Sequence, residues 1–415
     1  METSTHYMQR ALALARQAEG RTSPNPLVGA VIVHNGRVVG EGYHRCAGAP
    51  HAEVEALRVA GAMARGATMY VTLEPCAHHG RTPPCTEAII AAGISKVFYA
   101  TGDPNPLVNG KGHARLAAAG IAVDCGLCER EARELNRPFF KHVTTGRPLV
   151  TAKFAMSLDG KIATRTGDAR WISNPASRQR VHHLRNLSDA ILVGVGTVLA
   201  DNPCLTTRLP SSAGVRHPLR IVADSTGRAP LTAAIFDPQL PGHTVLATTT
   251  VAPAGYRAEL AARGVEVWTL PADPRGRVSL PALLDAIGQR GLLTLLVEGG
   301  SELLGALFAE GLVDRVWVFV APLIIGGVGA PGPVGQPGAA RLAGALRLRN
   351  LRVELIADPA DADHALPTQP DLWIQADVAP GAFEQTEVEE GESLPDPPTG
   401  RGVGKPGFPV CSHHH

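Results

Sequence analysis

The chain has 415 residues, which predicts two or three domains, and it carries 39 lysines and arginines against 38 aspartates and glutamates. This balance, with only 4% aromatic residues, excludes a chain-wide attraction to nucleic acid or to a membrane surface. No run of 18 apolar residues occurs and the N-terminus lacks a secretory pattern, so we expect neither a membrane span nor a signal peptide. Seven cysteines fit a reducing cytoplasm better than a disulfide framework.

The first part of the chain alternates predicted helices with predicted strands, which indicates an α/β layer fold. Apolar positions at helical spacing predict a helix over 4–19, and residues 23–33 form a turn that enters a strand. Asn35-Gly36 predicts a tight hairpin into the next strand. The remaining expected elements are a helix over 51–63, strands over 66–75 and 95–103, and helices over 115–119 and 129–142.

The segments 51–57 (HAEVEAL) and 72–85 (TLEPCAHHGRTPPC) contain the residue types of a catalytic zinc site. His51, Cys76 and Cys85 supply three protein ligands, which leaves one coordination position for water. Glu53 is then available as the general acid and base. We expect each cysteine to begin a helix, because a helix N-terminus lowers the pKa of a thiol and metal ligands must be thiolates.

This pattern resembles the His-x-Glu and Pro-Cys signature of zinc deaminases that act on nucleobases. It differs in one respect, because eight residues (77–84) separate the two cysteines instead of two. The alternative is a closed structural zinc site, with a fourth ligand from His44, His78 or His79. That alternative gives Glu53 no purpose, and we therefore favour a catalytic site.

Cys125 and Cys128 form an isolated C-x-x-C pair. The sequence does not place this pair at the start of a helix after a thioredoxin-like strand, so we assign it neither a redox role nor a second metal site.

Residues 4–145 resemble the cytidine-deaminase-like domain of riboflavin biosynthesis. The strings that carry the resemblance are SPNPLVGAVIV, EGYH, HAEVEAL, TLEPCAHHGRTPPC and GDPNPLVNGKG. The resemblance implies a pocket for a diaminopyrimidine ribose phosphate. The substrate-binding residues that it implies are Asn25, His44, His78, Arg81, Asp103 and Asn109.

A second run of strands and helices starts after a boundary that we place near Thr145, which gives domains over 1–145 and 146–378. Apolar strands with helices between most of them predict a second, mostly parallel sheet. The expected strands lie within 148–163, 219–227, 243–250, 264–270, 292–300, 314–322 and 351–357, and a helix, a buried strand and a glycine-containing turn lie within 177–203. The expected helices between strands are 257–263, 281–290 and 301–310.

Of two glycine-containing turns in this part, one has a geometry suited to binding a phosphate group. Gly194-Val195-Gly196 does not continue into a Rossmann G-x-G-x-x-G string. The turn 298–301 (EGGS) follows a buried strand and opens a helix, a geometry that presents free backbone N–H groups to a phosphate.

Residues 145–378 resemble the reductase of the riboflavin pathway, on the strings TAKFAMSLDGKIA, DAILVGVGTVLADNP and VEGG. The resemblance implies a dihydrofolate-reductase-like α/β fold that uses NADPH. The residues that it places against NADPH are Ala155, Trp171, Thr197, Asp201 and Gly300. The residues that it places against the substrate are Arg185, Leu205, Arg208 and Glu298, of which the two arginines suit a sugar phosphate.

Lys153 and Asp201 are the candidate catalytic residues of this second site. A lysine inside an apolar strand favours function over structure, and Lys153 could stabilise an opened sugar while Asp201 passes protons. One position departs from the family, because Ala169 stands where a serine is common two residues before Trp171.

The sequence therefore predicts a cytoplasmic bifunctional enzyme of riboflavin biosynthesis. Zinc-dependent deamination of the diaminopyrimidine ribotide would precede NADPH-dependent reduction of its ribosyl group to a ribityl chain. The rival readings are a nucleic-acid base editor, a non-catalytic scaffold, and a paralogue that acts on a related pyrimidine nucleotide. We expect a homo-oligomer with small-molecule ligands and with neither nucleic acid nor membrane as partner. The segment 326–339 is expected to be a surface loop and 379–415 a disordered tail, because it is rich in Pro, Gly and Glu.

Overall fold

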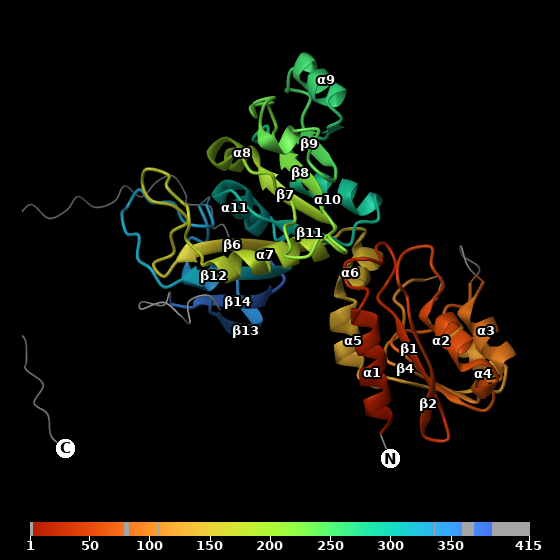
Figure 1. The fold of residues 1–415 in the computed structure, drawn as a ribbon. Coiled ribbons are helices and arrows are strands. Elements are labelled where there is room, and N and C mark those ends of the chain that lie inside the picture. Colours follow the sequence, from red (N-terminus) through yellow and green to blue (C-terminus); the bar gives the residue numbers. More distant parts are fainter. Residues whose placement is uncertain (1–2, 79–82, 107, 336, 359–368, 384–415) are drawn as a thin grey trace, which may run out of the picture.

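The computed structural model describes residues 3–78, 83–106, 108–335, 337–358 and 369–383, which form two α/β domains beside each other (Figure 1). Each domain has its own sheet, of five strands in the first and nine in the second. The expected α/β class is confirmed for both. Within the described residues, no helix combines the length and apolarity that a membrane crossing requires.

The first sheet has the order β2-β1-β3-β4-β5. β1 pairs antiparallel with β2 and β3, whereas β3, β4 and β5 run parallel. Its strands are β1 (Gly29–His34), β2 (Arg37–Tyr43), β3 (Thr68–Val71), β4 (Lys96–Tyr99) and β5 (Ala122–Cys125). Its helices are α1 (Ser4–Arg16), α2 (Ala52–Ala60), the 3-10 turn η1 (Gly61–Ala64), α3 (Cys85–Ala92), α4 (Lys111–Ala118), α5 (Glu129–Leu135) and α6 (Arg137–Thr145).

Helix α2 packs unusually closely on β2, and two glycines make this possible. A Cβ atom on Gly40 would lie 2.3 Å from the carbonyl oxygen of Ala56, and one on Gly42 would lie 2.6 Å from that of Ala52. Any larger residue at either position would push the helix away from the sheet. The close approach fixes the N-terminus of α2, where His51 is the N-cap and Glu53 lies in the first turn.

The second sheet has the order β10-β9-β8-β7-β11-β6-β12-β14-β13, parallel from β10 to β12 and antiparallel at β14 and β13. Its strands are β6 (Leu149–Ser157), β7 (Ala190–Gly194), β8 (Leu219–Ala223), β9 (Thr244–Thr248), β10 (Glu266–Thr269), β11 (Thr294–Val297), β12 (Arg315–Ala321), β13 (Leu348–Ile356) and β14 (Asp371–Val378). Its helices are α7 (Pro175–Leu187), α8 (Val195–Asp201), α9 (Ala254–Ala262), α10 (Leu280–Gln289) and α11 (Ser301–Ala309), with 3-10 turns η2 (Ala234–Phe236) and η3 (Leu342–Gly344). The expectation of a mostly parallel sheet is confirmed.

Several local expectations were wrong. Cys76 begins no helix and lies in an irregular segment, whereas Cys85 does begin α3. The expected helix over 129–142 is two helices that break at Asn136, because the buried amide of Asn136 bonds both the N–H and the carbonyl of Leu27. The expected turn after β7 is the short helix α8.

Two strands were missed, and both lie towards an edge of their sheet. β5 is largely exposed, so it lacks the alternation of apolar residues that marks a half-buried strand. β14 pairs with β12 and carries the buried Trp373. The segment 326–339 contains no helix or strand in its described residues, as expected, and the predicted tail lies outside the described residues from 384 onward.

The C-x-x-C pair also differs from its prediction. It connects β5 to α5, with Cys128 as the N-cap of that helix. Burial nevertheless raises the pKa of the Cys128 thiol, which disfavours the reactive thiolate form.

The two domains are joined through a buried carboxylate. Asp189, at 2% exposure just before β7, accepts hydrogen bonds from Ser23 Oγ (2.8 Å) of the first domain and from Arg216 Nη2 (2.7 Å). The N–H group of Leu293 donates to the same carboxylate at 2.8 Å. Arg216 reaches back across the boundary to the carbonyl of Gly20. One ionised side chain therefore fixes a loop of the first domain against two strands of the second.

Candidate active sites

The predicted zinc ligands come together at the N-termini of α2 and α3. The nitrogen of His51 and the two sulfurs of Cys76 and Cys85 all lie within 4.8 Å of one another. His51 Nδ1 is 3.1 Å from Cys85 Sγ and 3.7 Å from Cys76 Sγ. Such spacings suit one ion, because tetrahedral zinc with bonds of about 2.1–2.3 Å separates its ligand atoms by roughly 3.5–3.8 Å.

The chemistry of the donor set also fits zinc. The Cys76 sulfur accepts hydrogen bonds from the Cys85 side chain and from the Cys85 N–H, the latter at 3.3 Å, and these lower the pKa of Cys76. One nitrogen and two sulfurs form an incomplete tetrahedron. Of the candidate fourth ligands, His44 and His78 do not belong to the cluster, and His79 lies outside the described residues. The described ligands therefore leave one coordination position open, as in a catalytic site.

Glu53 lies beside the three ligands and is almost completely buried, at 3% exposure. Burial and the neighbouring Cys76 sulfur raise the pKa of this carboxyl group above its usual range. A carboxyl group with a raised pKa holds a proton more readily than an ordinary glutamate, which suits a group that must accept a proton and return it.

A cavity of about 290 Å³ opens onto these residues. Asn25 Nδ2 and His44 Nε2 are 3.0 Å apart in its wall. Asp103 lines the same cavity, and its pKa is raised to about 6, chiefly by burial. His78 also lines it, and its buried Nδ1 has no hydrogen-bond partner among the described residues. An unpaired polar atom in a cavity wall is a group that a ligand can satisfy.

Two predicted substrate residues are placed differently or not at all. Asn109 lines an adjoining cavity of about 640 Å³ between the domains, with Asp103 shared by both. Arg81 lies outside the described residues. Glu74 was missed: its carboxylate accepts the N–H groups of Gly110 and His113 at 3.1 Å each and so fixes the start of α4. Its position two residues before Cys76 was the available signal.

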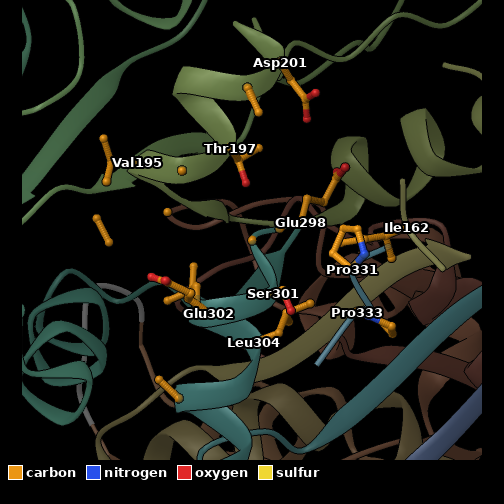
Figure 2. Close-up of a pocket in the computed structure, with 18 of the residues that line it drawn as sticks. Ile162, Val195, Thr197, Asp201, Glu298, Ser301, Glu302, Leu304, Pro331 and Pro333 are labelled. Carbon is orange, nitrogen blue, oxygen red and sulfur yellow. The ribbon is translucent and has the colours of Figure 1, made fainter. Parts of the chain in front are cut away.

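The second domain contains a larger cavity of about 870 Å³ at the carboxyl ends of its parallel strands. Figure 2 shows Thr197 and Asp201 on one side of it, from α8, and Ser301 on the other, at the start of α11, with Glu298 between them. The predicted residues that line it are Lys153, Ala155, Thr197, Asp201, Glu298 and Gly300, and Ala169 lines it as well. Ligands of open α/β sheets bind at this end of the strands.

A buried charge cluster lies at one end of this cavity. Arg185 holds Glu298 with two parallel hydrogen bonds of 2.7 and 2.9 Å, and Lys153 Nζ is 3.7 Å from the same carboxylate. Burial alone would raise the pKa of Glu298, but the two cations outweigh it and hold the pKa at about 2. Burial lowers the pKa of Lys153.

The other predicted residues, Trp171, Arg185, Leu205 and Arg208, do not belong to the lining of this cavity. Trp171 is 68% exposed, with the Arg178 guanidinium 4.6 Å from its ring centroid. The backbone N–H of Arg208 donates to His182 Nδ1 at 3.3 Å. Leu205 is buried with φ +51, a conformation that a branched side chain rarely adopts.

Three arginines that line the cavity were missed, namely Arg228, Arg275 and Arg277. They come from two separate loops. No local spacing in the sequence connects them, so only the fold brings them to one cavity.

Two family models match the chain. The cytidine and deoxycytidylate deaminase zinc-binding region matches residues 1–101, and the RibD C-terminal domain matches residues 148–359. The second match alone spans half of the chain.

Similar proteins of other bacteria agree with both matches. The riboflavin biosynthesis protein RibD of Aquifex aeolicus is 47% identical over 78% of this chain and 88% of its own length. That of Actinobacillus pleuropneumoniae is 43% identical over 88% of this chain and 96% of its own.

Solved structures extend the likeness to the whole fold. RibD of Acinetobacter baumannii superposes with a TM-score of 0.78 at 39% identity, over 90% of this chain and 98% of that one. A Thermotoga maritima structure, described as a diaminohydroxyphosphoribosylaminopyrimidine deaminase/5-amino-6-(5-phosphoribosylamino)uracil reductase, has a TM-score of 0.75 at 34% identity and the same coverage. The chain therefore belongs to the RibD family of riboflavin biosynthesis, whose members join a zinc-binding deaminase domain to a reductase domain.

Proposed function

We propose that this chain carries out two consecutive steps of riboflavin biosynthesis. The first domain hydrolyses the amino group of 2,5-diamino-6-(5-phosphoribosylamino)pyrimidin-4(3H)-one, and the second reduces the ribosyl group of the product to give 5-amino-6-(5-phosphoribitylamino)uracil. The observation that carries the proposal is the cluster of His51, Cys76 and Cys85 with the buried Glu53 at the mouth of a small cavity.

In the first site, His51, Cys76 and Cys85 would hold the zinc ion. Zinc bound by three protein ligands activates water for attack at neutral pH. Glu53 takes the proton that the attacking water gives up and returns it to the amino group, which leaves as ammonia. Asn25 and His44 offer polar groups to the pyrimidine from the cavity wall.

In the second site, Thr197, Asp201 and Gly300 in the cavity wall would hold NADPH, which would supply a hydride to C1′ of the substrate. Lys153 stabilises the opened form of the sugar by its charge. Burial lowers the pKa of Lys153, and the ionised Glu298 carboxylate, 3.7 Å away, acts against that shift. Asp201, at the end of α8, relays protons from its place in the cavity wall. Arg208 and Arg185 bind the phosphate group of the substrate, and Arg185 also donates a hydrogen bond to Glu298.

The proposal is tested with a coupled assay on the full chain, which follows ammonia release and the loss of nicotinamide absorbance. Glu53→Gln should lower ammonia release by roughly 10²- to 10⁴-fold, because it removes the proton carrier while it preserves the shape of the side chain. The same variant should reduce the pre-deaminated intermediate at the wild-type rate.

Glu55→Gln is the matched control, since Glu55 lies on the same helix and pairs with Arg58 at 3.1 Å on the surface. It should keep both activities. A wild-type protein that binds zinc but releases no ammonia from this ribotide would favour a related pyrimidine nucleotide as substrate. Ala169, in the wall of the second cavity, is the position to examine in that case.

We further propose a homodimer built on the second domain, in the cytoplasm. β13 is the outermost strand of the nine-stranded sheet, and Leu351, Val353 and Leu355 on it are each more than half exposed. An exposed apolar strand at the edge of a sheet is a template for pairing with another chain. The described cysteines are all unpaired, which suits a reducing compartment. Sedimentation of the wild type and of Leu351→Lys would test the dimer.

A further inference from the structure

The larger cavity crosses four neighbouring strands, and this fixes where its two ends lie. β6 carries Lys153, and the carboxyl ends of β11, β7 and β8 follow in that order across the sheet. Three strand spacings of about 4.8 Å separate β6 from β8, so the cavity extends roughly 14 Å away from Lys153. A dinucleotide with its nicotinamide at Lys153 would extend its adenosine toward the end of β8.

That far end is rich in positive charge. Arg228 follows β8, while Arg275 and Arg277 lie in the loop between β10 and α10, and all three line the cavity; we call them the arginine cluster. Arg228 is exposed and makes no hydrogen bond or ion pair with any residue that the structure describes. Arg277 Nη1 is 3.9 Å from a carboxylate oxygen of the exposed Glu302, which forms a solvent-exposed ion pair with it.

The loop that carries two of these arginines is held in place by its own hydrogen bonds. Asp273 Oδ1 accepts the N–H groups of Arg275 and Arg277, each at 2.8 Å. The N–H of Val278 donates to Ser225 Oγ at 2.9 Å and ties the loop to the end of β8. The arginine side chains are therefore presented by a fixed turn, which lowers the entropy cost of binding an anion.

The carboxylate at the end of β8 is not available to a ribose. An acidic residue near this place would accept hydrogen bonds from both ribose hydroxyls and would favour NADH. Asp224 follows β8 directly, but it is fully buried, and its oxygens accept the N–H groups of Gly227 at 3.1 Å and Ala229 at 2.8 Å. The surface at this end therefore offers arginines and the hydroxyl of Thr226, and both groups suit a phosphate.

We propose that the arginine cluster binds the 2′-phosphate of NADPH and so sets the preference for NADPH over NADH. This inference rests on the proposed reductase function and names the residues that select its cofactor. Asp273 and Glu302 line the same end of the cavity, but Asp273 is engaged by its own turn, and the carboxyl group of Glu310 lies near Arg275 outside the lining. A phosphate dianion would provide a charge partner for Arg228, which has no ionic partner among the described residues.

The test measures binding and not turnover, by calorimetric titration of the full-length protein with NADPH and with NADH. The double variant Arg275→Ser/Arg277→Ser should bind NADPH about tenfold or more weakly, because charge-assisted bonds to phosphate are lost. Its affinity for NADH should stay within about twofold of the wild type, which also shows that the domain is folded. Arg352→Ser, on β13, is the matched control and should change neither affinity.

Titration with 2′,5′-ADP and with 5′-AMP isolates the phosphate itself. The wild type should prefer 2′,5′-ADP, and the double variant should lose most of that preference. The inference is overturned if the wild type binds NADPH and NADH equally, or if the double variant weakens both to the same extent. A wild type that binds neither dinucleotide would overturn the proposed reductase function as well, so the two failures are distinguishable.

Discussion

Two buried glutamates, one in each domain, are shifted in opposite directions. Glu53 is 3% exposed and its pKa is raised, whereas the side chain of Glu298 is 6% exposed and its pKa is about 2. Burial acts on both in the same direction, since it penalises the ionised form. The difference comes from their neighbours, because Arg185 and Lys153 face Glu298 while a cysteine sulfur faces Glu53.

This comparison separates two uses of a buried carboxyl group. A raised pKa suits a group that must carry a proton from water to a leaving amine. A lowered pKa suits a group that stays ionised and favours the charged form of a neighbouring lysine. The sequence shows only a glutamate in each case, and the sign of the shift depends on residues that the fold brings from elsewhere.

The largest expected effect comes from a substitution that abolishes the zinc site of the first domain and leaves the reductase site of the second domain intact. Cys76→Ser replaces a zinc ligand, so zinc affinity should fall by more than the roughly 10- to 100-fold that loss of a supporting residue costs. Ammonia release should fall to background, and reduction of the pre-deaminated intermediate should be unchanged. Zinc content by elemental analysis and the two assays measure this.

Cys125→Ser is the control for that variant, because Cys125 is an exposed cysteine outside the metal cluster. It should keep its zinc and both activities. Loss of reduction in Cys76→Ser would show that the domains do not work independently.

The next effect breaks the charge pairing of Glu298. Arg185→Met should destabilise the second domain by about 3 kcal/mol, because a buried carboxylate then loses its best partner while Lys153 remains at 3.7 Å. Urea unfolding measures the change. Adding Glu298→Gln to that variant should recover stability, and a double variant as unstable as Arg185→Met would show that the arginine acts through packing instead.

The zinc site could be predicted because its chemistry is local. His51, Glu53, Cys76 and Cys85 fall within one short segment, and metal chemistry restricts which residue types can serve. The helix expected at Cys76 was wrong, since ligand identity does not determine the backbone around it.

Long-range partners could not be predicted in this way. The Asp189 carboxylate accepts hydrogen bonds from the N–H of Leu293, 104 positions away in the sequence, and from the hydroxyl of Ser23, 166 positions away. The arginine cluster depends likewise on the order of strands in the sheet. Strand and helix types follow from local periodicity, whereas which loops meet is decided by tertiary packing.

The low pKa of Glu298 predicts a dependence of stability on pH. Its pKa is about 2 in the folded chain and near its ordinary value of 4.5 when unfolded, so it binds protons more readily in the unfolded state. The stabilisation, about 3 kcal/mol, is therefore complete above pH ~5 and is lost as the pH falls toward 2. Unfolding free energies of the wild type and Glu298→Gln at pH 6 and pH 3 should show a smaller pH dependence in the variant. Equal dependence in both would contradict the assignment.

The smallest expected effect is at the contact between the domains. Ser23→Ala removes one hydrogen bond to Asp189, which keeps Arg216 and the N–H of Leu293, so the cost should be about 1–2 kcal/mol. Asp189→Asn should cost more, since it takes the charge away from Arg216 and from every other donor at once. Thermal unfolding ranks the two variants, with Ser211→Ala on an exposed loop as the control. If Ser23→Ala lowered the unfolding temperature more than Asp189→Asn, the Asp189 carboxylate would not be the group that joins the two domains.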